Sequence, residues 1–257
     1  MGIIFNKVNN NINFNIEDAN IYSFIGDSKS IKSLIGEYIV NPKLCKNGKV
    51  IISENIKIGY VNNNPYNYFK NLSVEKLLES ILKKNKYKKD KIDTRINEVL
   101  NIVNLDKKYL NTIDNDLDYV NAKKLSFACA LIFNPNVIVL DNYTECLNNS
   151  DRKELMRLIK MLKNRYNKIL ILLTKDTSFC YEVGGYVYLV NDSEIVKKGT
   201  YEIIRNTSLI NRLNLRVPPI IKFIKEYKKN NDEFNDYNNT LDLIKGIYRD
   251  IGYRGDK

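Results

Sequence analysis

The segment Phe24–Leu34 constrains the fold of this chain more than any other stretch. An apolar run, Ile21–Ile25, leads into Gly26 and a polar turn, after which apolar residues recur at helical spacing. A strand, a loop and a helix in this order are the layout of a phosphate-binding loop. The formula for such a loop is Gly, four residues, Gly, Lys and then Ser or Thr. The turn is therefore a candidate phosphate site.

The match to this formula is incomplete. Gly26, Lys32 and Ser33 are in register, but Ile31 replaces the second glycine. Lys32 would place a positive charge on the terminal phosphates, and Ser33 would offer its hydroxyl to Mg²⁺. The branched side chain of Ile31 resists positive φ and holds the backbone away from a ligand. An ordinary strand-to-helix turn is therefore an equally open interpretation. The candidate phosphate-binding residues are Gly26, Asp27, Ser28, Lys29, Ser30, Ile31, Lys32 and Ser33.

Composition restricts the chemistry of the chain. None of its 257 residues is a histidine, which excludes an imidazole base, a histidine that senses the γ-phosphate and a His-ligated metal. The net charge of +11 favours polyanions such as nucleic acid, nucleotides or an anionic membrane. The lysines are spread along the sequence, however, which favours an ordinary solvated surface.

The sequence gives no indication of secretion or of a membrane span. Cys45, Cys129, Cys146 and Cys180 are far apart and form no metal-type pair, which favours free thiols in a reducing compartment. No signal peptide is recognisable, and no apolar run approaches the roughly 20 residues that cross a bilayer. We expect a cytosolic chain, alone or on a membrane partner.

The order of the apolar segments predicts an α/β domain with a parallel-centred sheet. The all-apolar runs at 137–141 and 169–173 are typical of buried parallel strands. Only helical spacing is found at about 65–135, so this stretch is expected to be a helical subdomain inserted between sheet-forming parts. We expect a nucleotide-binding domain over residues 1–207 and a helical tail over residues 208–257.

A short hairpin is expected before the helical subdomain. Asn47-Gly48 is a favoured two-residue hairpin turn, and residues 43–46 and 50–52 flank it. The sequence therefore predicts that these two segments pair with each other.

Asp141 is the second chemical signal. It closes the apolar run at 137–141, and at the carboxyl end of a central strand it would face the phosphate loop. There it would hold Mg²⁺, partly through water. The alternative is an acid that caps the next turn.

In this order of segments the chain resembles the ATP-binding subunits of ABC transporters, and most closely the ATPases of energy-coupling-factor (ECF) transporters. The resemblance covers about residues 1–230 and implies a P-loop NTPase-like ABC nucleotide-binding domain with a helical insertion and a C-terminal helical tail. The matching residues are Asn134-Pro135 with the strand ending at Asp141, then Thr144, Leu147, Asp151–Leu155, Leu173-Thr174, Ile195, Gly199-Thr200 and Leu213-x-Leu215-x-Val217-Pro218.

The resemblance also implies ligands and partners. ATP and Mg²⁺ are the expected cofactors, with Ser33, Asp141 and Asn63 at the metal. The expected partners are a membrane-spanning transporter subunit and either an intact ABC ATPase or a second copy of this chain. The chain would then be cytoplasmic and peripheral on the inner face of the cell membrane.

The residues that carry chemistry in the family are altered here. Asn142 occupies the position of the catalytic Glu and cannot act as a base on water. Lys175 replaces the switch histidine, and Asn63 replaces the Gln that links the metal to the membrane subunit. The Leu-Ser-Gly-Gly-Gln signature aligns with residues 117–121, which have lost both glycines, and Asn148 replaces the Asp of the D-loop. No aromatic residue is evident for stacking on adenine.

Three functions follow, in this order. The first is a degenerate subunit, a pseudo-ATPase that docks on a transporter and pairs with an intact ATPase. The second is an active ATPase that energises transport of a vitamin, a metal ion or another small solute. The third is a basic regulatory or nucleic-acid-binding module, which draws only on the net charge.

Overall fold

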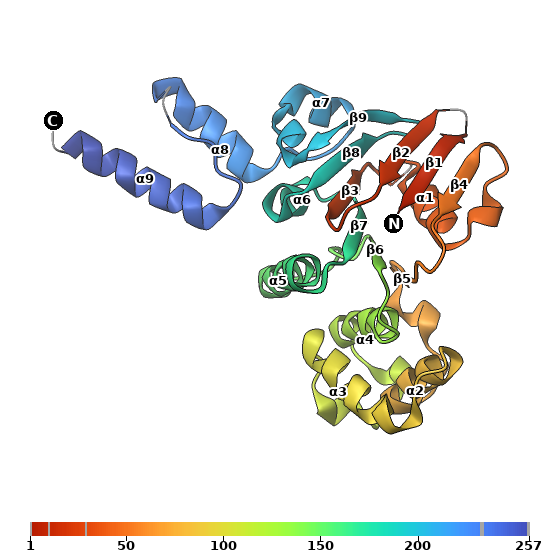
Figure 1. The fold of residues 1–257 in the computed structure, drawn as a ribbon. Coiled ribbons are helices and arrows are strands. Elements are labelled where there is room, and N and C mark those ends of the chain that lie inside the picture. The colour runs from red at the N-terminus through yellow and green to blue at the C-terminus, as the bar shows by residue number, and fades with distance from the viewer. Residues whose placement is uncertain (1, 10, 29, 232–233, 256–257) are drawn as a thin grey trace.

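The computed structural model of the chain describes the backbone of residues 2–9, 11–28, 30–231 and 234–255, and the side chains as far as residue 251. Figure 1 shows a large sheet at the centre, a smaller sheet beside it, a group of helices below and two helices that extend away at the C-terminal end.

The central sheet has six strands in the order β5-β6-β7-β3-β8-β9, with only β9 antiparallel to its neighbour. The strands β3, β6 and β7 are buried along their whole length, as their continuous apolar sequences predict. The bounds of the six strands are β3 Ile21–Ile25, β5 Ile58–Val61, β6 Val137–Asp141, β7 Ile169–Thr174, β8 Tyr186–Val190 and β9 Ile195–Thr200.

The smaller sheet is antiparallel and corrects one prediction. Its order is β2-β1-β4, formed by β1 (Ile3–Val8), β2 (Ile12–Ile16) and β4 (Lys49–Ile52). The hairpin expected at Asn47-Gly48 is wrong, because β4 pairs with β1 and Pro42–Leu44 forms a 3-10 helix. Proline at the first position of that helix fixes its φ and removes a ladder donor.

Residues 65–135 contain helices and turns, with a single isolated bridge between Ser73 and Ile113. Apolar residues at helical spacing bury one face of each helix in a shared cluster with α5 and the central sheet. The helices are α2 (Val74–Lys84), α3 (Ile92–Ile102) and α4 (Tyr119–Leu131), as the sequence predicts to within two residues.

The remaining helices surround the sheet and form the tail. Sequence reasoning missed α6 and α7, which are short and mostly not amphipathic. Ile210 and Ile221 share a core cluster with Ile25, so the chain stays attached to the sheet through the start of α8. The proposed division at residue 207 stays a prediction. The helices are α1 Lys32–Val40, α5 Asn149–Tyr166, α6 Thr177–Val183, α7 Thr207–Arg212, α8 Pro219–Tyr227 and α9 Thr240–Gly255.

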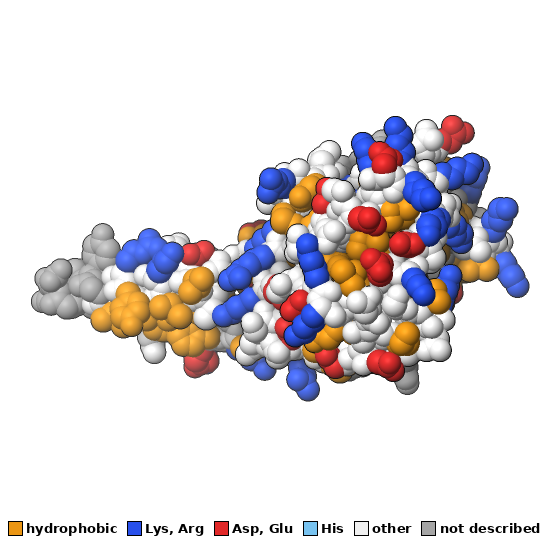
Figure 2. All heavy atoms as spheres, turned by 90° about the horizontal axis from the view of Figure 1, so that it is seen from below, with side chains coloured by type: hydrophobic (Ala, Val, Ile, Leu, Met, Phe, Trp, Pro, Cys, Tyr) orange, Lys and Arg blue, Asp and Glu red, His pale blue; other side chains and the backbone are white. Residues whose placement is uncertain are grey.

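The surface bears on the third candidate function. Figure 2 shows Lys and Arg side chains distributed over the visible face among acidic ones, while hydrophobic side chains gather along the tail. In that tail Leu241 and Tyr248 are 73% and 74% exposed. Among the described residues, no helix combines the length and the apolar composition that crossing a bilayer requires.

Gly59 is a point at which the fold tolerates no side chain. A Cβ on this residue of β5 would collide with the carbonyl oxygen of Ala130 in α4. We expect Gly59→Ala to destabilise the protein by about 1–3 kcal/mol, since backbone must move to admit the methyl group. Gly199→Ala is the control: its Cβ would meet only the end of the Ile203 side chain, and a smaller loss is expected. Equal losses in urea unfolding would contradict this packing argument.

Candidate phosphate site

The sheet brings the chemical signals of the sequence to one edge. The strands β6, β7 and β3 are parallel neighbours, so their carboxyl ends lie side by side. Asp141 is in register with Leu173, and Ile25 with Thr174. The Gly26 amide donates a hydrogen bond to the Thr174 carbonyl at 3.2 Å. The phosphate loop, Asp141 and Lys175 therefore meet at the same edge, as the sequence predicts.

Lys32 lies inside the loop rather than over it. The residue is only 1% exposed, and its Nζ donates hydrogen bonds to the Asp27 carbonyl and to Ser30 Oγ, the latter at 3.4 Å. Burial lowers the pKa of Lys32, although the negative charges of Asp141 and Asp27 act in the opposite direction. The ammonium group that would bind phosphate is thus held by the loop's own oxygens.

Two amides of the loop are also engaged within the protein. Ile31 N donates to the carbonyl of Asn191 at 3.0 Å, and Ser30 N donates to the carbonyl of Asp27 at 3.3 Å. Ile31 has an ordinary φ of −66°, and its side chain is 6% exposed within the core cluster of the smaller sheet. An isoleucine is therefore accommodated without strain, because it closes the loop against the β8–β9 turn.

Other candidates in the loop are placed as follows. Ser28 and Ser33 are exposed, Asp27 is half-buried, and Lys29 lies outside the described residues. The side chain of Ser30 packs against Gly26, where a Cβ would collide with it, so this position requires glycine.

Asp141 has an unsatisfied oxygen directed at this site. The residue is 7% exposed, and Tyr60 donates its hydroxyl to Oδ2 at 2.9 Å. Oδ1 is buried and has no hydrogen-bond partner in the described part of the chain. Burial raises the pKa of Asp141, while the Tyr60 hydroxyl and the Lys32 charge lower it. A buried carboxylate oxygen without a donor suits a cation, so Asp141 fits a Mg²⁺ ligand.

The other expected metal ligands are less well placed. No direct hydrogen bond between Ser33 and Asp141 occurs among the described residues, so contact through one ion or water stays a prediction. Asn63 is exposed in the turn after β5, and its role as a ligand also stays a prediction. Within the described ranges, no group of three or more His, Cys, Asp or Glu residues is arranged to hold a metal by itself.

The loop after Asp141 contains a residue that sequence reasoning missed. Asn142, at the position of the family's catalytic Glu, has φ of 45° and donates its amide to the Leu173 carbonyl at 2.7 Å. Lys175, at the position of the switch histidine, forms an ion pair with Glu145 at 3.2 Å. Only the adjacency of the β6 and β7 ends could have indicated this pair.

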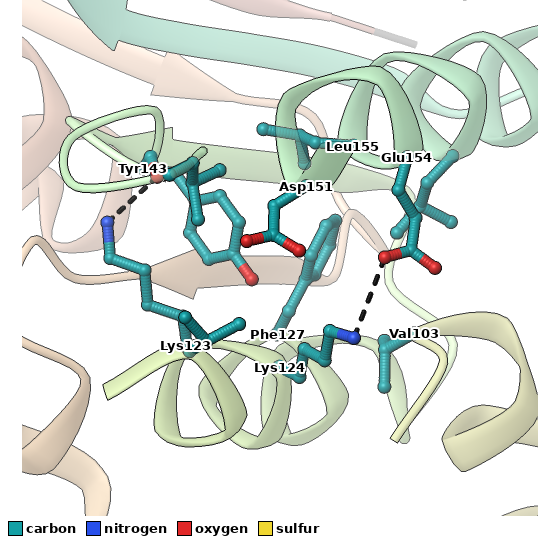
Figure 3. A pocket seen from close by; sticks show the side chains of 11 residues that line it. Val103, Lys123, Lys124, Phe127, Tyr143, Asp151, Glu154 and Leu155 are labelled. Atoms are coloured by element: carbon teal, nitrogen blue, oxygen red, sulfur yellow. Dashed lines mark hydrogen bonds and ion pairs between the residues drawn. The ribbon is translucent and has the colours of Figure 1, made fainter. Parts of the chain in front are cut away.

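A buried lysine joins the helical subdomain to this loop. Figure 3 shows Lys123 of α4 directed at Tyr143, with Asp151 and Glu154 of α5 nearby. Lys123 is 1% exposed and donates to the carbonyls of Tyr143 and Glu145 at 2.9 Å and 2.5 Å. The cavity beside it has a volume of about 30 Å³, which is room for one water and not for a nucleotide.

The altered signature has a structural role of its own. Asp118 is the N-cap of α4 and accepts hydrogen bonds from the amides of Val120 and Asn121, both at 3.0 Å. These bonds lower the pKa of Asp118, the bond from Asn121 having the larger effect. The acid thus stabilises the start of the helix.

Comparisons with known proteins agree with this geometry. The chain is 27% identical over 248 residues to the energy-coupling factor transporter ATP-binding protein EcfA1 of Staphylococcus aureus (strain USA300), an alignment that covers 91% of this chain and 90% of that protein. The solved structure of cbiO1 from Clostridium perfringens, part of the ABC transporter complex cbiONQ, has a TM-score of 0.71 at 19% identity and covers 87% of this chain and 98% of that one. No protein-family model matches the chain.

A second solved structure has the same architecture. The ATP-binding cassette MJ0796, in a dimeric post-hydrolysis state bound to ADP and Pi, has a TM-score of 0.67 at 22% identity and covers 74% of this chain and 89% of that one. The chain has the fold of an ABC cassette. The predicted fold class and the resemblance to ECF transporter ATPases are therefore confirmed. In this ABC cassette Asp141 stands at the strand end beside the loop, and the consequences of the altered residues stay to be tested.

The buried Asp141 generates a prediction about stability. Because its pKa is raised in the folded protein, its contribution to stability is fully present below the pKa of the unfolded chain and is lost as pH rises. We expect Asp141→Asn to stabilise the metal-free protein at pH 7 by about 1 kcal/mol, or about 2–4 °C in Tm.

This gain should vanish at acidic pH, at which the carboxyl is protonated in both states. Thermal unfolding between pH 4 and pH 7, in the presence of a chelator, measures it. The exposed Asp192→Asn is the control and should show no such pH-dependent gain. A destabilised Asp141→Asn at pH 7 would show that the carboxylate is satisfied in the folded state.

Proposed function

We propose that this chain is the ATP-binding-cassette subunit of an ECF-type membrane transporter, and that it binds Mg-nucleotide weakly and does not turn it over alone. The similarity along nearly its whole length to an ECF transporter ATP-binding protein supports the family role. The closed loop carries the second part: Lys32 and the Ile31 amide already have partners inside the protein.

Nucleotide binding has to compete with these internal bonds. Lys32 Nζ would leave the Asp27 carbonyl to meet a phosphate, and the loop would separate from Asn191 to free the Ile31 amide. Ser33 and Asp141 would hold Mg²⁺, which would supply charge neutralisation between the phosphates. Part of the binding energy is therefore spent on opening the loop.

Hydrolysis lacks a base among the residues assigned to the family's catalytic positions. The side-chain amide of Asn142 cannot accept a proton from water, and Lys175 is a cation that already pairs with Glu145. Asp118 offers no amide-rich glycine turn to a facing subunit, because it caps α4. These features favour a pseudo-ATPase over an active ATPase.

A transporter role for such a chain requires a partner. We propose that it pairs with an intact ATPase, whose own catalytic residues serve the other composite site, and that it docks on a membrane-spanning subunit at the inner face of the membrane. Such a dimer tolerates one weak site. The mixed distribution of charge on the visible face gives a nucleic-acid role no support (Figure 2).

The first test concerns binding. Lys32→Ala should abolish whatever Mg-ATP binding exists, because it removes the cation directed at the phosphates. Lys49→Ala, which removes an exposed lysine of β4, is the control and should bind as the unmodified chain does. Calorimetry measures both, with thermal unfolding as a check of folding. Tight ATP binding that survives Lys32→Ala would contradict the proposal.

The second test concerns turnover. We expect negligible phosphate release from the isolated chain, since losing one water-orienting or charge-stabilising group costs on the order of 10² to 10³-fold in rate and several are altered here. The assay compares the chain alone, the variant with Asn142→Glu and Lys175→His, and a mixture with an intact ABC ATPase. Robust turnover by the unmodified chain alone would restore the active ATPase.

A further inference from the structure

We propose that Glu145 is a positioning residue that sets the preference of this site between nucleoside triphosphate and diphosphate, by holding Lys175 away from the terminal phosphate. The inference rests on the proposed function, since it requires a nucleotide in the loop. It assigns a role to a residue for which neither the sequence nor the comparisons provide one.

The ion pair stands at the mouth of the phosphate loop. Glu145 Oε1 lies 3.2 Å from Lys175 Nζ, and the two side chains are 33% and 59% exposed. Lys175 directly follows Thr174, whose carbonyl accepts the hydrogen bond from Gly26. Lys175 is therefore one residue away from the strand end that carries the loop.

The turn that presents Glu145 is fixed from several sides. Asn142 N bonds to the Leu173 carbonyl at 2.7 Å, and Glu145 N bonds to the Asn142 carbonyl at 3.1 Å. The buried Lys123 holds the carbonyl of Glu145 at 2.5 Å. With its backbone held on both sides, the carboxylate has little freedom to follow Lys175 toward a ligand.

The charges of the pair act on the residues of the site. Glu145 raises the pKa of Lys32 and of Asp141, and Lys175 lowers that of Lys32, although burial is the larger cause for both of these groups. A carboxylate at this place opposes a polyanion, while a freed Lys175 would attract one. Glu145 therefore weakens triphosphate binding directly and also by occupying the lysine.

A terminal phosphate is able to take Lys175 from Glu145. An exposed ion pair is weak, and a phosphate carries more charge than a carboxylate. A triphosphate places its third phosphate beyond the loop, toward Lys175, and a diphosphate has no group to place there. The exchange of partners is thus specific to the triphosphate.

The experiment measures the ratio of two dissociation constants on the full-length chain. Calorimetry gives the affinity for Mg-ADP and for a Mg-bound ATP analogue whose β–γ bridge resists hydrolysis. We expect Glu145→Gln to shift the ratio toward the triphosphate by about twofold to fivefold, and Lys175→Gln to shift it the other way. In the double variant, Glu145→Gln should no longer shift the ratio, because the two residues act as a pair.

Matched controls are available in the tail. Glu226 and Lys229 form an exposed ion pair at 2.8 Å, so Glu226→Gln and Lys229→Gln remove the same charges far from the loop and should leave the ratio unchanged. If nucleotide binds but Glu145→Gln leaves the ratio unchanged, or shifts it equally without Lys175, this inference is wrong and the proposed function stands. If neither nucleotide binds to any variant, the proposed function fails with it.

Discussion

Removing an ammonium group from water costs free energy unless oxygen atoms replace its hydration. At Lys32 the oxygens come from the phosphate loop itself, through the Asp27 carbonyl and the Ser30 hydroxyl. This interaction determines the shape of the loop and fills the place that a phosphate would take. The neighbouring Ile31 completes the closure, since its amide bonds to Asn191 and its side chain joins the core. The loop is thus stable without a ligand, and any ligand must replace contacts that already exist.

The sequence predicts the elements that depend on local pattern. The continuous apolar runs of β3, β6 and β7 have one consistent interpretation, and parallel neighbours bring their carboxyl ends together. Asp141 therefore reaches the loop as expected. The hairpin at Asn47-Gly48 failed because β1, a distant strand, pairs better with β4 than the local segment does. Pairing between distant segments is decided by the whole fold, and local turn chemistry does not reveal it.

The same limit applies to the site. Tyr60, Glu145 and Asn191 come from three different parts of the chain, and their relation to Asp141, Lys175 and Ile31 exists only after folding. The altered family positions have structural uses that sequence reasoning could not provide. Asp118 caps a helix, and Asn142 takes a left-handed conformation that asparagine adopts more readily than most residues. Several departures from the family are thus explained by the stability of this fold.

Amide hydrogen exchange at Ile31 tests the closed loop most directly. NMR exchange rates are measured on the full chain without nucleotide and then with saturating Mg-ATP. The account predicts that the Ile31 amide is already protected without nucleotide, because it is bonded to the Asn191 carbonyl inside the protein. It also predicts that nucleotide adds little protection there. Rapid exchange in the free chain, with strong protection only when Mg-ATP is present, would show an open loop that waits for its ligand and would contradict the account.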